Sequence, residues 1–202
     1  MRLLSPYART ENARGVSPNA YIRDLWVSPQ TGRVAYFSGA KDIGAAVHEL
    51  DPETGVARDI VKIAPKDLTV GLSLRGWLDR NLILVRSLAF HEDRSSDAEI
   101  VVVDGSGGIR TVGRIANVFG PTIRLNPSNR ALYLTRTESG THNVFMFSLD
   151  TGALTAVTQN ALPGVTFSGF RPLGGQGVLG VREERREDIW LIQQTATPQP
   201  KR

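Results

Sequence analysis

VSPQTGRVAYF (residues 27–37) joins a Ser-Pro turn to an apolar strand, and the chain returns to this pattern further on. A second strand then ends at LDPETG (residues 50–55), where an aspartate and a glycine form the next turn. LNPSNRALYL (residues 125–134) and LDTG (residues 149–152) repeat both parts. Short strands that recur with a period of about 45 to 50 residues are typical of the blades of a β-propeller. The repeat therefore predicts an all-β propeller.

Working outward from these turns, the sequence predicts about four four-stranded blades after an N-terminal segment at residues 1–22. The blades occupy residues 23–64, 65–116, 117–160 and 161–193. The polar tail at residues 194–202 is expected to be disordered. Two arrangements remain open. RLLS (residues 2–5) resembles the outer strand of a blade and would complete the fourth blade of a closed ring, or the chain is the C-terminal part of a larger propeller.

The third strand of each predicted blade is apolar on both faces, as in IVVV (residues 100–103) and VFMF (residues 144–147). A strand with one face in water would alternate apolar and polar residues. These continuous apolar runs therefore favour blades that are stacked face to face.

The turns that follow these third strands share a pattern of an aspartate and then a glycine. Each aspartate is expected to accept hydrogen bonds from backbone N–H groups two residues on, and each glycine to adopt a positive φ. The aspartates are Asp51, Asp104 and Asp150, and the glycines are Gly55, Gly105 and Gly152. We expect these aspartates to be structural.

SPQTGRVAY (residues 28–36) and SGTHNVFMFSLDTGAL (residues 139–154) resemble the repeat of TolB-like, or WD-like, β-propellers. The likeness covers most of the chain and is poorest in the second blade, where WLDRN (residues 77–81) replaces the Ser-Pro turn. The repeat is also similar to the propeller of prolyl oligopeptidase-like proteins. Such repeats specify fold more than function. What the resemblance implies is a scaffold that binds proteins or peptides.

Composition excludes some classes of function. The 202 residues include no cysteine, so disulfides and thiolate metal sites are impossible. The net charge is +4, but the cations are scattered, and a nucleic-acid partner is therefore not expected. No stretch approaches the roughly 20 apolar residues of a membrane span. The chain shows no secretory signal, and although the resemblance permits the periplasm, the compartment stays unassigned.

Motifs for chemistry are weak, and we expect no catalysis, no metal and no cofactor. TFSGF (residues 166–170) is not the G-x-S-x-G elbow of a serine hydrolase. GQGVLG (residues 175–180) matches a dinucleotide-binding pattern, but it should lead into a strand and not into a helix. His48 is expected to pack or lie at a strand edge, and His142 to lie in a loop, without metal-ligand spacing.

A partner is expected to bind near the propeller channel, at the entries to inner strands and in the loops between second and third strands. The longest polar loop is at residues 90–97 and is the most distinctive insertion. Arginine and tyrosine dominate the energetics of protein interfaces. The predicted partner-binding residues are Tyr21, Arg23, Asp24, His91, Glu92, Arg94, Phe119, Arg124 and Arg182.

The sequence therefore predicts a non-catalytic scaffold for a protein or peptide. Two alternatives remain: the truncated gating propeller of a prolyl oligopeptidase-like enzyme, and a propeller that binds a small molecule or sugar. If the ring is incomplete, exposed sheet edges would favour a homo-oligomer.

Overall fold

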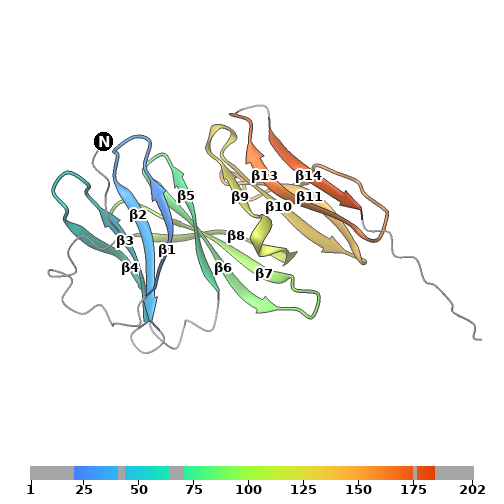
Figure 1. Ribbon diagram of the computed structural model, residues 1–202, viewed down its shortest axis with the longest axis horizontal. Helices are drawn as coiled ribbons and strands as arrows, with labels where there is room; N and C mark the ends of the chain where they lie inside the picture. The colour runs from blue at the N-terminus through green and yellow to red at the C-terminus, as the bar shows by residue number, and fades with distance from the viewer. Residues whose placement is uncertain (1–20, 41–43, 64–70, 175–176, 185–202) are drawn as a thin grey trace, which may run out of the picture.

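The computed structural model describes residues 21–40, 44–63, 71–174 and 177–184, and the regular structure of this part consists of antiparallel strands and two short 3-10 turns (Figure 1). The expected strand at residues 2–5, the third strand of the fourth blade and the tail at 194–202 lie outside the described residues. So do most of the N-terminal segment and the GQ pair (residues 175–176) of the dinucleotide-like motif.

The first blade is a four-stranded meander in which each strand pairs with the next along the chain. Its strands are β1 (Tyr21–Val27), β2 (Val34–Ala40), β3 (Gly44–Leu50) and β4 (Ala57–Ile63). The second blade has the same order. Its strands are β5 (Leu72–Leu78), β6 (Asn81–Phe90), β7 (Ser96–Val103) and β8 (Ile109–Val118).

The third blade is built around a long central hairpin, with two short 3-10 turns beside its inner strand. Its elements are η3 (Gly120–Thr122), β9 (Arg124–Asn126), η4 (Pro127–Asn129), β10 (Ala131–Glu138), β11 (Thr141–Ser148) and β12 (Leu154–Ala156). A single pairing of Val118 with Arg136 joins it to the second blade. The described part of the fourth blade is the hairpin β13 (Val165–Pro172) and β14 (Val178–Glu184). β14 begins within the glycine motif, at Val178, so the motif leads into a strand, as the sequence predicts.

Apolar cores lie between successive blades. Alternate side chains of β7 enter two different cores, because Ile100 contacts the third blade and Val101 contacts the first. The core between the first two blades also contains Phe37 and Val47, and the core between the second and third blades also contains Leu132. The prediction that the third strands are covered on both faces is therefore confirmed for β7. Burial of such side chains is the main stabilising contribution to the stack.

The described blades form an arc of a propeller. Figure 1 shows β1–β4 at one end of the molecule and the β13–β14 hairpin at the other, with the second and third blades between them. This is a partial propeller, and the strand that the sequence proposes for ring closure lies outside the described residues.

The turns correct two of the predictions. Asp51 and Asp104 accept backbone N–H groups as expected, but Ser148 takes this position in the third blade, since its hydroxyl accepts from Thr151 N at 3.2 Å. Asp150 lies two residues further and pairs with Arg130 instead. The second-blade turn is also shorter, and its positive φ falls on Gly107 at +89° and not on Gly105.

Candidate functional site

The β6–β7 loop, predicted to contact a partner, has a defined structure. His91 N donates to Ser95 O at 2.9 Å, and Arg94 adopts a positive φ of +67° within the turn. Hydrogen bonds from Ser95 lower the pKa of Asp93. The side chains of His91, Glu92 and Arg94 remain exposed. The loop therefore presents the carboxylate of Glu92 and the guanidinium of Arg94 on a backbone that is held in one conformation.

Asp97 connects this loop to the end of β8. Its carboxylate lies 3.0 Å from His91 Nε2 and accepts from the backbone N–H of Asn117 at 3.2 Å. The hydrogen bond to His91, followed by that from Asn117, lowers the pKa of Asp97. Asp97 thus fixes the loop relative to the segment that leads to Phe119.

Phe119 and Arg124 border the η3 turn, where the chain enters the third blade. Phe119 is half-buried and its N–H donates to Thr135 O at 2.9 Å. Arg124 Nη1 donates to the carbonyls of Pro121 and Ile123 at 2.9 and 2.8 Å. Arg75 of β5 donates to Gly120 O at 3.2 Å and holds the same turn from the second blade.

Arg182 lies further along the arc, on the exposed strand β14 opposite Phe167. Its guanidinium is 3.3 Å from Glu184. Thr135 contacts this blade as well, because its hydroxyl donates to Phe167 O at 3.2 Å. Thr135 therefore connects the Phe119 segment to the hairpin of Arg182, through its carbonyl on one side and its hydroxyl on the other.

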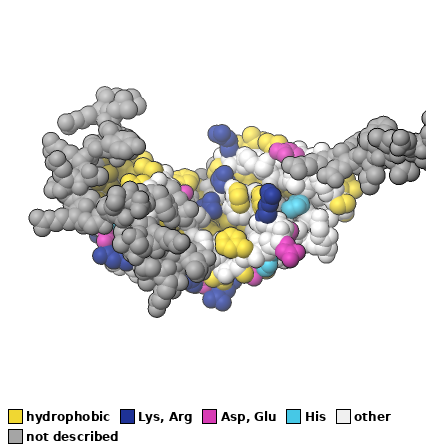
Figure 2. Space-filling view, turned by 60° about the horizontal axis from the view of Figure 1, so that its bottom comes forward, with side chains coloured by type: hydrophobic (Ala, Val, Ile, Leu, Met, Phe, Trp, Pro, Cys, Tyr) yellow, Lys and Arg dark blue, Asp and Glu magenta, His cyan; other side chains and the backbone are white. Residues whose placement is uncertain are grey.

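We call the surface formed by residues 90–97 and 119–124 the loop face. His91, Glu92 and Arg94 lie together in the β6–β7 loop, which contacts the end of β8 through Asp97 and Asn117. Phe119 and Arg124 follow β8 at the entry to the third blade, and Arg182 lies on the next hairpin. Figure 2 shows the molecule with the lower edge of Figure 1 brought forward, and its described part has apolar side chains interspersed with basic, acidic and histidine side chains. This mixed chemistry suits a polypeptide better than a polyanion.

The blade-one residues are placed differently. Tyr21 and Arg23 lie on β1, where they pair with Gly39 and Phe37. Asp24 follows at an irregularity of this strand with a φ of +56°. Its half-buried carboxylate accepts from Leu74 N at 3.1 Å and so connects the inner strands of the first two blades.

Two tryptophans strengthen the same inter-blade contact. Trp26 Nε1 donates to Leu74 O at 3.2 Å, and Trp77 Nε1 donates to Trp26 O at 3.1 Å. The side chain of Asp24 is therefore engaged in the contact between the first two blades, whereas the side chains of His91, Glu92 and Arg94 are exposed.

Sequence reasoning missed Phe90. It is the last residue of β6, and 67% of its surface is exposed beside the His91 loop. Leu88 on the same strand is also exposed, at 38%. The sequence places Phe90 at the start of the polar loop at residues 90–97, whereas the structure extends β6 through it. The signal was present, because the apolar residues alternate through Leu88 and Phe90.

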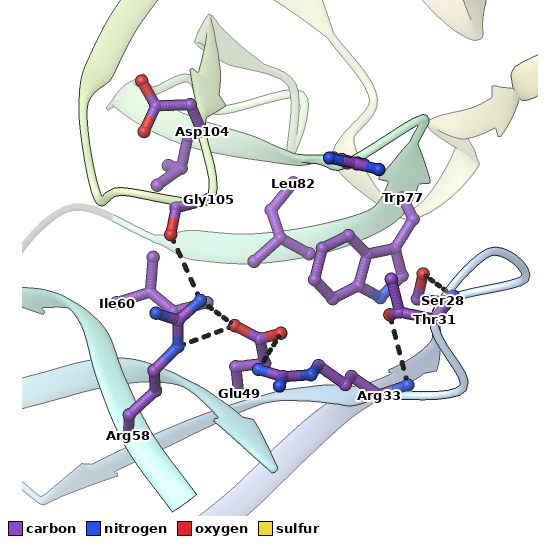
Figure 3. Close-up of a pocket in the computed structure, with 12 residues that line it drawn as sticks. Ser28, Thr31, Arg33, Glu49, Arg58, Ile60, Trp77, Leu82, Asp104 and Gly105 are labelled. Atoms are coloured by element: carbon purple, nitrogen blue, oxygen red, sulfur yellow. Dashed lines mark hydrogen bonds and ion pairs between the residues drawn. The ribbon is translucent and has the colours of Figure 1, made fainter. Parts of the chain in front are cut away.

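A second feature that the sequence did not predict is a cleft of about 270 Å³ between the first two blades (Figure 3). Glu49 is buried there between two arginines, with Oε1 3.1 Å from Arg33 Nη1 and Oε2 2.9 Å from Arg58 Nε. Arg58 also donates to Gly105 O of the second blade at 3.1 Å. Trp77 lines the apolar wall. The charged groups are engaged with one another, and the cleft contributes to holding the blades together.

The described residues contain no group of three or more acidic, histidine or cysteine side chains placed to hold a metal ion. Within the same ranges, no helix is long and apolar enough to cross a membrane.

Comparisons with known proteins point to the fold. No protein-family model and no curated protein matches the sequence. TolB from Acinetobacter baumannii is 14% identical, with 81% of this chain and 41% of that chain covered and a TM-score of 0.51. A putative TolB from Agrobacterium tumefaciens is 18% identical, with 80% and 54% covered and a TM-score of 0.53.

The β-propeller domain of the trilobed protease from Pyrococcus furiosus is 11% identical over 87% of this chain and 59% of that domain, with a TM-score of 0.45. The chain spans 41% and 54% of the two TolB structures, about half their length. At these identities the likeness concerns the fold, and the chain has a β-propeller fold that resembles that of TolB.

Proposed function

We propose that this chain is a partner-binding propeller that takes a protein or peptide on the loop face and performs no chemistry there. The observation that supports this most is Phe90, a large aromatic side chain that is 67% exposed next to charged side chains on an ordered loop. Aromatic and arginine side chains at the centre of an interface supply most of its binding energy. A ligand that covered Phe90 would also reach Arg94 and His91.

The order of the loop favours binding without a large entropic cost. His91, Asp97 and Asn117 already hold the backbone in one conformation, so less freedom is lost when a partner docks. An extended peptide could place an apolar side chain on Phe90 and polar groups on the surrounding charges.

The proposal is tested with peptides selected from a displayed random library against the purified chain. Dissociation constants are then measured for the original protein, F90A and I109A. Ile109 is the matched control, because it is also apolar and 61% exposed but begins β8, beyond the Asp104 turn. Loss of an aromatic anchor costs at least about 1.4 kcal/mol, which is a tenfold weaker affinity.

We expect F90A to weaken binding at least about tenfold and I109A to change it less than about twofold. Equal affinities for F90A and the original protein would contradict the proposal. If oligosaccharides raise the melting temperature and no peptide is selected, the small-molecule alternative is supported instead.

A further inference from the structure

A line of three side chains crosses the first blade on the face turned away from the second blade. Ser38 Oγ of β2 lies 2.6 Å from His48 Nε2 of β3, and His48 Nδ1 lies 2.7 Å from Asp59 Oδ1 of β4. Phe37 and Val47, which alternate with Ser38 and His48, are buried against the second blade. The line is therefore separate from the inter-blade core and from the loop face.

The chemistry of the three groups fixes the direction of the hydrogen bonds. An ionised aspartate can only accept, so a neutral His48 must carry its proton on Nδ1. Nε2 then holds a lone pair, and the Ser38 hydroxyl is its donor. This is the order of groups in a nucleophile, base and orienting acid, which is recognised by geometry and not by a sequence motif.

Asp59 is held in its charged form. Burial works against the carboxylate, but hydrogen bonds from Lys62 and His48 outweigh it and lower the pKa of Asp59. Lys62 Nζ lies 3.0 Å from Asp59 Oδ2. Tyr36 stacks on the imidazole with ring centroids 4.7 Å apart, and only 17% of the His48 side chain is exposed. The base is thus oriented by a carboxylate on one side and by an aromatic ring on its face.

The surroundings of Ser38 indicate the class of substrate. Ile22 of β1 pairs directly with Ser38, so the two side chains share one face of the sheet. Ile22 is 56% exposed, and Val27 on the same strand is 64% exposed. Ser38 is half-buried. An apolar group resting on β1 would bring a neighbouring carbonyl to the serine hydroxyl.

We propose that Ser38 is a nucleophile that cleaves esters with a short apolar acyl group, with His48 as its base and Asp59 as a positioning residue. Ser38 Oγ bonds to the ester carbonyl carbon while its proton passes to His48 Nε2. The C–O bond to the alcohol then breaks, and the alcohol leaves with that proton. Water oxygen then bonds to the acyl carbon while a water proton passes to His48 Nε2. The C–O bond to Ser38 breaks, the carboxylic acid leaves, and Ser38 Oγ takes the proton back from His48.

Side-chain contacts can hold three neighbouring strands together without a serine. A cross-strand line of the second blade, formed by Arg86, Glu99 and Arg114, joins three strands by ion pairs without any hydroxyl. The line in the first blade differs by pairing a hydroxyl with an imidazole.

The test is covalent labelling of the full chain with a fluorophosphonate, followed by peptide mass spectrometry, and acylation by p-nitrophenyl butyrate. Ser168 is the internal control: it is half-buried like Ser38 and its hydroxyl donates to Glu183 at 3.2 Å, but no histidine bonds to it. General-base catalysis is worth about 10²–10⁴-fold, so Ser38 should react at least about 100-fold faster than Ser168.

S38A should abolish the label at this peptide, S168A should leave it unchanged, and H48Q should slow it about 100-fold. D59N should slow labelling while circular dichroism shows a folded chain. Equal labelling of Ser38 and Ser168 in the folded protein would overturn the proposal. So would an H48Q variant that stays folded and labels at the original rate, because Ser38 would then have no base.

Discussion

Asp24 offers a sharp test of how the blades are held together. Its carboxylate accepts the backbone N–H of Leu74 at 3.1 Å, and its own backbone has a φ of +56°. Three substitutions separate these two contributions. D24N keeps a hydrogen-bond acceptor and tolerates positive φ, D24G keeps only the backbone freedom, and D24A keeps neither.

The magnitudes follow from these differences. A hydrogen bond to a charged group stabilises by about 1.5–3 kcal/mol, and D24G should lose that amount. Alanine in the left-handed region adds about 1 kcal/mol, so D24A should lose about 2.5–4 kcal/mol. D24N exchanges a charged acceptor for a neutral one and should lose about 1 kcal/mol. The predicted order of stability is therefore D24N, D24G and D24A.

Urea unfolding followed by tryptophan fluorescence measures this series, because Trp26 and Trp77 lie in the same contact. Equal losses for D24A and D24G would refute the argument from backbone conformation. A loss below about 0.5 kcal/mol for D24A would refute the argument that this hydrogen bond stabilises the junction.

Two other predictions concern packing and charge. Gly113→Ala should destabilise by about 1–3 kcal/mol, because the added Cβ would lie 2.8 Å from the Phe147 ring, whereas Gly105→Ala, with open space around it, should be nearly neutral in the same urea assay. Equal effects of the two would contradict the packing. Glu99→Gln should cost about 2 kcal/mol at about pH 7, because it leaves Arg86 and Arg114 without their carboxylate. Burial works to raise the pKa of Glu99, but hydrogen bonds and charge from both arginines outweigh it, so the folded-state pKa is lowered. The stabilisation is therefore full above the ordinary pKa and is lost as pH falls through the lower folded value, so the difference between the original protein and E99Q should vanish in acid. A difference that does not shrink as the pH falls below the ordinary pKa of a glutamate would contradict this sign.

The sequence carried enough information for the blades because each strand has its own local signal. Ile100 and Val101 reach two cores, as their apolar run predicts. The Asp51 turn was also predictable, because it depends on a local hydrogen bond from the backbone N–H of Glu53, two residues on, to the Asp51 carboxylate.

The errors arose where the spacing shifts by a residue or two. Asp150 follows a leucine as Asp51 does and also precedes a Thr-Gly pair, but Ser148 begins the equivalent turn. His142 was expected in a loop and lies within β11, because the β10–β11 hairpin is tighter than its polar sequence suggests.

Contacts across strands could not be read from the chain at all. Ser38, His48 and Asp59 have no motif in common, and only the register of β2, β3 and β4 brings them into line. The same holds for Glu49, whose partners Arg33 and Arg58 come from either side of it in sequence. Of the two expectations for His48, packing is the one that the structure shows: it lies on β3, between β2 and β4, stacked on Tyr36 and with both ring nitrogens engaged.

The most direct test of the account is hydrogen–deuterium exchange on the complex with a library-selected peptide. Binding to the loop face predicts slower exchange in residues 90–97 and 119–124, with no change in the turn at residues 104–108. Protection confined to that turn, or to the cleft around Glu49, would show that the partner binds elsewhere and would contradict the central claim.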